Sequence, residues 1–174
     1  MSDAVLEGKT AIVTGAAGGI GRVLVAALLD SGANVAALDV DAVALSGLDA
    51  LREKHDSSRL LCSAVDVADY AACASAVESS IARLGGLHIL INNAALGLGV
   101  VRENHFSRPV AIQEIDPAVW ERFMAVNATG AWNMTRASID HLLAQQWGRV
   151  INVTTSFFTM PVSYTHLRAH ETRR

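Results

Sequence analysis

The sequence predicts an α/β fold with a doubly wound parallel sheet, and two observations support that prediction. Short runs of small and β-branched apolar residues alternate along the chain with longer stretches of helical periodicity. This alternation is typical of repeated strand–helix–strand units, whose crossovers are right-handed and whose strands are parallel. Apolar residues make up 51% of the chain and aromatic residues only 5%, which suits helices packed on a buried parallel sheet.

Five strands are expected, each a short apolar run. They cover residues 10–14, 34–38, 60–65, 87–91 and 149–153. Helices are expected over residues 20–31, weakly over 41–54, over 69–84, and from Pro117 to about Gln146 with a break at 127–130. Asp116 is the expected cap before Pro117, because proline suits the first helical position. Residues 96–115 are expected to be irregular.

Composition and charge exclude several classes of function. The length of 174 residues indicates one domain. The net charge is −3 and no basic block occurs, so neither nucleic acid nor an anionic membrane is an expected partner. Residues 1–8 do not resemble a signal peptide, and no run of about 18 uncharged apolar residues could span a membrane. Cys62 and Cys73 form no CxxC pair, so we expect two reduced thiols in the cytoplasm and no metal site.

The segment TGAAGGIG at residues 14–21 follows the first expected strand and opens the first expected helix. Backbone N–H groups at a helix start, together with the helix dipole, attract phosphate groups. Glycines let the backbone approach a ligand closely and adopt positive φ. We therefore predict that this loop binds the pyrophosphate of a dinucleotide. A tight turn without any ligand is the alternative.

Asp39 ends the second expected strand. In dinucleotide-binding folds, an acidic residue at this place accepts a hydrogen bond from a ribose 2′-hydroxyl. Its carboxylate would repel a 2′-phosphate, and residues 16–18 contain no Arg or Lys to compensate. The sequence therefore favours NAD over NADP. Asp41 competes for this role, and a helix cap or a solvated loop acid is the other interpretation of Asp39.

Five motifs in order resemble the short-chain dehydrogenase/reductase family. Thr14, Gly15, Gly19 and Gly21 match its T-G-x-x-x-G-x-G pattern. Asp66-Val67 is similar to its adenine-contacting pair, and Asn92-Asn93-Ala94-Ala95 is similar to its N-N-A-G motif, with alanine as the last residue. Asn127 is similar to the asparagine that breaks the long helix and holds a water of the proton relay. Residues 151–156 are similar to the motif that ends in the substrate-orienting serine, for which Ser156 is the simpler candidate and Thr155 the alternative.

The resemblance covers residues 9 to about 160. It implies a Rossmann-type sheet of which this chain would hold five of about seven strands. It also implies hydride transfer between the nicotinamide of NAD(P) and a small carbonyl or alcohol substrate, in a parent protein that forms homo-oligomers. The implied cofactor-binding residues are Thr14, Gly15, Gly19, Ile20, Gly21, Asp39, Asp66, Val67, Asn93 and Ala94. The implied catalytic residues are Asn127 and Ser156.

The chain departs from the family at the general acid/base. The family uses a Tyr-x-x-x-Lys motif, in which the lysine cation lowers the pKa of the tyrosine. Here Tyr164 is followed four positions later by Arg168, and no lysine follows Lys54. Because arginine differs from lysine in geometry, it is not a simple substitute. We expect the 174-residue chain itself to be inactive. A non-catalytic dinucleotide-binding module and a short enzyme that uses Tyr164 and Arg168 are the alternatives.

The last residues have an unusual composition. Residues 162–172 (VSYTHLRAHET) resemble one translated reading frame of an adapter used in DNA library preparation. We therefore expect residues 1–161 to form the dinucleotide-binding domain and residues 162–174 to be a non-native tail. Under this interpretation, Tyr164 has no catalytic role and the pair His166 and His170 is not a zinc site. A genuine divergent terminus is the alternative.

Overall fold

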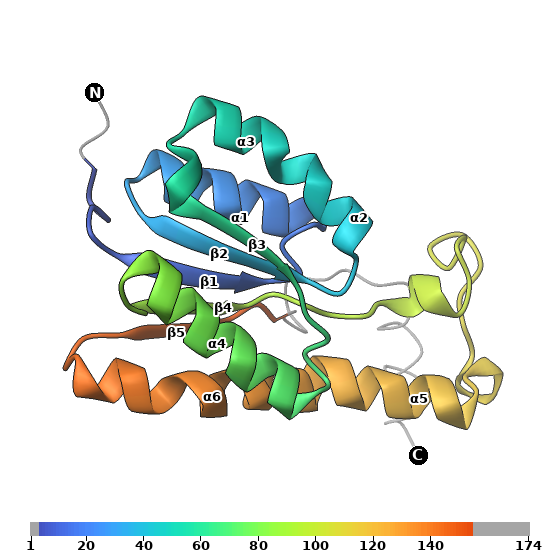
Figure 1. Cartoon of the computed structure of the whole chain (residues 1–174). Helices are drawn as coiled ribbons and strands as arrows, with labels where there is room; N and C mark the ends of the chain where they lie inside the picture. Colours follow the sequence, from blue (N-terminus) through green and yellow to red (C-terminus); the bar gives the residue numbers. More distant parts are fainter. Residues whose placement is uncertain (1–3, 155–174) are drawn as a thin grey trace, which may run out of the picture.

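The computed structural model describes residues 4–154. In this range, one sheet of five parallel strands lies between two layers of helices, in the order β3-β2-β1-β4-β5 (Figure 1). The strands are β1 (Thr10–Thr14), β2 (Asn34–Asp39), β3 (Leu60–Ala64), β4 (Ile89–Asn92) and β5 (Arg149–Asn152). The strand order reverses between β1 and β4, as it does in Rossmann-type sheets. The predicted α/β class and its five strands are confirmed.

The helices divide between the two faces of the sheet (Figure 1). One face carries α1 (Gly19–Asp30), α2 (Ala42–Leu45) and α3 (Asp49–Lys54). The other carries α4 (Tyr70–Leu84) and α6 (Ala131–Ala144), and α5 (Pro117–Met124) continues into α6. The expected break at residues 127–130 is instead a π-helical turn over Ala125–Gly130, so the helix is widened rather than interrupted. Single π-turns of this kind frequently mark functional sites.

Each strand contributes apolar side chains to both faces. Ile12 pairs in register with Ala36 and Leu90, and all three belong to the core beneath α4 and α6. Their neighbours Val13 and Val35 belong to the core beneath α1. Successive strand residues point to opposite faces, so a strand covered on both sides is an unbroken apolar run. This explains why β1 is buried along its whole length.

Aspartate side chains start three of these helices. The side chains of Asp41, Asp69 and Asp116 accept hydrogen bonds from backbone N–H groups in the first turns of α2, α4 and α5. These caps satisfy donors that a helix start leaves unpaired. Pro117 occupies the first turn of α5, as predicted. Gly85, in the left-handed conformation with φ +83°, ends α4.

One expected element differs in detail from the structure. The weak helix at 41–54 is divided into α2, a 3₁₀ turn at Ser46–Leu48 and α3. The segment between β4 and α5 is irregular, as expected, with 3₁₀ turns at Leu98–Val100 and Ile112–Glu114. Within the described range, no helix has the length and apolar character needed to cross a lipid bilayer.

Candidate functional site

Two glycines in the turn after β1 are required by the fold itself. Gly15 has φ +63°, and a Cβ there would lie 2.8 Å from the Cα of Ala94. A Cβ on Gly21 would lie only 2.1 Å from the carbonyl oxygen of Gly15. Both approaches involve backbone atoms that cannot move easily, so any larger residue would distort the turn. Gly15 and Gly21 therefore close the turn tightly on itself.

Gly19 differs from these two glycines. A Cβ on Gly19 would meet nothing within 4 Å, and its φ is not in the left-handed region. The packing of the protein therefore does not require glycine here. Gly19 begins α1, whose N-cap is Gly18, and no side chain caps this helix and no acidic residue lies in its first turn. The arrangement leaves open space in front of uncapped N–H groups, which is the geometry that binds phosphate.

The loop after β4 is fastened to the turn after β1. The Thr14 Oγ1 atom accepts hydrogen bonds from the backbone N–H groups of Asn93 and Ala94, each at 3.0 Å. The amide nitrogen of the Asn93 side chain donates to the carbonyl oxygens of Thr14 and Gly15, at 3.0 and 3.1 Å. The structure thus brings together four residues that the sequence analysis assigned to cofactor binding.

The acidic residue that ends β2 and the one that follows the strand have different roles in the structure. One oxygen of Asp39 accepts a hydrogen bond from the Ala17 N–H at 2.9 Å, and the other accepts from the Asp41 N–H at 3.1 Å. Asp41 uses one oxygen to cap α2 through the N–H groups of Val43 and Ala44. Asp39 therefore borders the glycine turn, whereas Asp41 is committed to a helix start.

Asp66 and Val67 follow β3 and lie against the long helix. One Asp66 oxygen accepts from the Ala68 N–H at 2.9 Å, and the other pairs with the Arg122 guanidinium at 2.8 Å. Burial raises the pKa of Asp66, but these two interactions outweigh it, so its pKa lies below the usual value. Val67 is buried, and its carbonyl oxygen accepts from the Asn133 side chain at 2.8 Å.

Sequence reasoning missed Arg122. It lies 56 positions from Asp66, and no local pattern in the sequence connects the two residues.

Asn127 lies in the π-helical turn and holds the loop after β4. Its side-chain oxygen accepts from the Leu96 N–H at 2.7 Å, and its side-chain nitrogen donates to the Leu96 carbonyl at 3.0 Å. The carboxyl ends of β4 and β5 meet nearby, where the Asn92 side chain donates to Asn152 Oδ1 at 2.9 Å. Thr155 and Ser156 lie outside the described residues.

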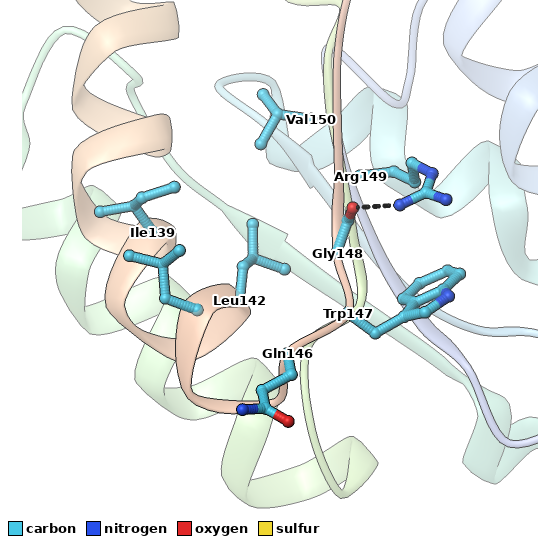
Figure 2. A pocket seen from close by; sticks show the side chains of 8 residues that line it. Ile139, Leu142, Gln146, Trp147, Gly148, Arg149 and Val150 are labelled. Carbon is cyan, nitrogen blue, oxygen red and sulfur yellow. Dashed lines mark hydrogen bonds between the residues drawn. The ribbon is translucent and has the colours of Figure 1, made fainter.

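One further feature, a groove, stands apart from this site. A groove between α6 and the start of β5 is lined by Leu142, Gly148 and Val150, among others (Figure 2). It lies at the amino end of β5, at the opposite edge of the sheet from the glycine turn.

Among the described residues, no group of three or more His, Cys, Asp or Glu side chains could hold a metal ion. Burial raises the pKa of Cys73 to about 11, so this thiol is not an activated nucleophile.

Comparisons with known proteins agree with this geometry. The family model "short chain dehydrogenase" matches residues 9–166. A short chain dehydrogenase/reductase of Macrophomina phaseolina is 32% identical over 152 residues, which cover 86% of this chain and 82% of that protein. Against several other curated relatives, the chain spans about half of their length, between 52% and 55%.

Solved structures show the same fold. A putative short-chain alcohol dehydrogenase of Sinorhizobium meliloti has a TM-score of 0.77 and 31% identity, over 92% of this chain and 60% of that one. A 3-ketoacyl-(acyl-carrier-protein) reductase of Brucella melitensis, crystallised with NADH, has a TM-score of 0.74 and 29% identity, over 86% and 58% of the two chains. From its glycine turn, its strand order and these matches, the chain belongs to the short-chain dehydrogenase/reductase family.

Proposed function

We propose that this chain binds NAD at the carboxyl edge of its sheet, as the cofactor half of an oxidoreductase. The observation that carries the proposal is the difference between the glycines of one turn. Gly15 and Gly21 are required by backbone packing, whereas Gly19 faces open space before the uncapped start of α1. A glycine that the protein's own packing does not need leaves room for a pyrophosphate to approach the backbone.

The adenosine part of the cofactor would lie over the ends of β2 and β3. Asp39 would accept a hydrogen bond from a ribose hydroxyl, and Asp66 with Val67 would border the adenine. The lowered pKa of Asp66 keeps its carboxylate ionised at neutral pH, so it can accept a hydrogen bond from an amino group. A negative Asp39 disfavours a 2′-phosphate, which supports NAD rather than NADP. The Brucella reductase that shares this fold was crystallised with NADH.

The chemistry supplied by the cofactor is hydride exchange with a carbonyl or alcohol carbon of a small substrate. Thr14, Asn93 and Ala94 would fix the floor of the nicotinamide site, because their hydrogen bonds join the ends of β1 and β4. Asn127 would hold the wall formed by the loop after β4, through its two hydrogen bonds to Leu96. Ser156 is the proposed residue that orients the substrate oxygen.

The test is calorimetric titration of the chain with NAD and NADP, combined with the substitution Gly19→Ala. We expect NAD to bind more tightly than NADP. Gly19→Ala should remove binding of both cofactors while the urea midpoint stays unchanged, because the new methyl group meets no protein atom in the free chain. Absence of heat with both cofactors in a folded wild-type chain would overturn the proposal.

A second candidate is a dinucleotide-binding module without catalysis. The observation in its favour is that Arg168, and not a lysine, stands four positions after Tyr164. Steady-state oxidation of a panel of alcohols, with Tyr164→Phe as a control, separates both candidates from a short enzyme that uses Tyr164 and Arg168. NAD binding without turnover of any alcohol excludes that enzyme. Turnover that Tyr164→Phe abolishes favours an enzyme that uses Tyr164.

A further inference from the structure

A closed ring of hydrogen bonds joins the glycine turn to the segment after β2. The Ala17 N–H donates to Asp39 at 2.9 Å, and the Asp41 N–H donates to the same carboxylate at 3.1 Å. The Asp41 side chain in turn accepts from the Ala44 N–H at 2.9 Å. Arg22 closes the ring, since its Nη2 donates to the Ala44 carbonyl at 3.0 Å and its Nε donates to the Ala17 carbonyl at 2.6 Å.

The ring holds the Asp39 carboxylate and leaves some of its hydrogen-bond acceptor sites available to a ligand. A carboxylate offers about four lone-pair sites, and the ring occupies two of them, one on each oxygen. Sites therefore remain on a carboxylate whose rotation is restricted. The backbone of Ala17 is likewise held at both ends of the residue, by Asp39 at its N–H and by Arg22 at its carbonyl oxygen.

Arg22 owes its position to a neighbouring glycine. A Cβ on Gly47 would lie 2.4 Å from the Arg22 Nη1 atom and 2.7 Å from its Nη2 atom. The guanidinium therefore rests directly on the backbone of Gly47, and it reaches the Ala44 carbonyl from there. Substitution of Gly47 would displace the guanidinium without removing its charge.

We propose that Arg22 is a positioning residue for Asp39 and thereby sets the preference of the site for a free ribose 2′-hydroxyl. The inference rests on the proposed NAD site. The guanidinium makes its recorded hydrogen bonds to main-chain carbonyls, so its effect on the ligand passes through the ring. Without Arg22, the link between Ala44 and Ala17 is lost, so the backbone segments whose N–H groups hold the Asp39 carboxylate are less restrained. Pre-organised acceptors bind more tightly because less freedom is lost on binding.

The test uses two probes, ADP-ribose and its analogue that lacks the 2′-hydroxyl of the adenosine ribose. We expect the wild-type chain to bind ADP-ribose about tenfold more tightly than the deoxy analogue. Arg22→Ala should weaken ADP-ribose binding by about that factor and leave the deoxy analogue almost unaffected, so that the preference disappears. Arg22→Lys should also lose it, because an ammonium lacks the planar fork that reaches two carbonyls.

Two further variants separate positioning from stability. Gly47→Ala keeps the arginine and should not weaken the short helical segment, since alanine is the better helix former. We expect the Gly47→Ala chain to lose the preference for the ribose 2′-hydroxyl as well. Arg59→Ala is the matched control, because the Arg59 guanidinium also donates to two main-chain carbonyls, of Leu29 and Ala33, at the opposite edge of the sheet. It should lower the urea midpoint and keep the wild-type preference.

The outcomes distinguish this inference from the proposed function. If the wild-type chain binds ADP-ribose but Arg22→Ala and Gly47→Ala keep its preference for the 2′-hydroxyl, the role of Arg22 is refuted and the NAD site stands. If Arg59→Ala changes the preference as much as Arg22→Ala does, the effect is one of general stability and the role of Arg22 is also refuted. A folded wild-type chain that binds neither NAD nor ADP-ribose refutes both.

Discussion

Strand β1 begins and ends with a buried threonine. Both hydroxyls donate to a backbone carbonyl oxygen, and that of Thr14 also accepts backbone N–H groups. At the amino end, the Thr10 Oγ1 donates to the Leu84 carbonyl at 3.2 Å, and the Thr10 N–H donates to His88 Nδ1 at 3.0 Å. At the carboxyl end, the Thr14 Oγ1 accepts two backbone N–H groups from the loop after β4. One threonine helps to close its edge of the sheet, and the other ties two loops together.

The surroundings of the two threonines differ in the same way. Large side chains fill the amino edge, where Trp147 packs edge-on against His88 and lies beneath the Lys9 ammonium at 4.4 Å. At the carboxyl edge of β1, glycine and alanine predominate, since residues 15–19 and 94–95 are all glycine or alanine. Polar groups there are satisfied with little side-chain bulk, so room remains for a ligand. The comparison shows that the space at the carboxyl edge of the sheet depends on small residues as much as on polar ones.

The largest expected effect is that of Gly21→Ala at the carboxyl edge. Its Cβ would lie 2.1 Å from the Gly15 carbonyl oxygen, so the turn must deform, at a cost of about 3 kcal/mol in the free energy of unfolding. Urea unfolding followed by circular dichroism measures this cost. Gly19→Ala is the control and should change stability by less than about 0.5 kcal/mol. Equal costs for the two variants would show that the turn is not closed as described.

The two threonines themselves provide the next test. Thr14→Val leaves the N–H groups of Asn93 and Ala94 without their acceptor and should cost about 2 kcal/mol. Thr10→Val should cost less than about 1 kcal/mol, because the Leu84 carbonyl keeps a hydrogen bond from the Asn34 side chain. Both costs can be measured by urea unfolding. A larger loss for Thr10→Val would reverse the comparison between the two ends of β1.

His88 gives the amino edge a pH dependence. Burial, together with the Lys9 charge, lowers the pKa of His88 below its usual 6.5, and its Nδ1 must stay unprotonated to accept from Thr10. The stability that unprotonated His88 contributes to the fold is therefore fully present above pH 6.5, and it is lost as the pH falls through the lowered pKa of His88. His88→Asn offers an amide oxygen that does not titrate. Unfolding measured from pH 7 to 5 should show a smaller loss for this variant; an identical slope would exclude His88 as the cause.

Lys9→Met should have the smallest effect, a loss of about 0.5 kcal/mol in the free energy of unfolding. The substitution removes the cation–π contact between the Lys9 ammonium and the Trp147 ring. It should also raise the pKa of His88, because the Lys9 charge lowers it. Titration of the His88 ring by NMR measures this shift. An unchanged His88 pKa would show that burial alone sets it.

Much of the fold could be predicted from local sequence. Asp116 and Pro117 predicted the start of α5, and the apolar run at residues 10–14 predicted β1 at its observed bounds. The loss of helical regularity near Asn127 was also predicted, but its form was not, since a π-helical turn depends on how the helix packs. The glycines of the first turn were identified together. Only the tertiary structure separates Gly15 and Gly21, which packing requires, from Gly19, which packing does not require.

By itself, the sequence determined the alternation of strands and helices, the glycine turn and the acid at the end of β2, because each of these is a local pattern along the chain. Tertiary structure decided the partners. Arg122 meets Asp66 across 56 positions, and Arg22 meets Ala44 across 22. Such pairs form only when loops from different strands converge at one edge of the sheet, and a parallel topology brings those loops together. No spacing in the sequence encodes that convergence.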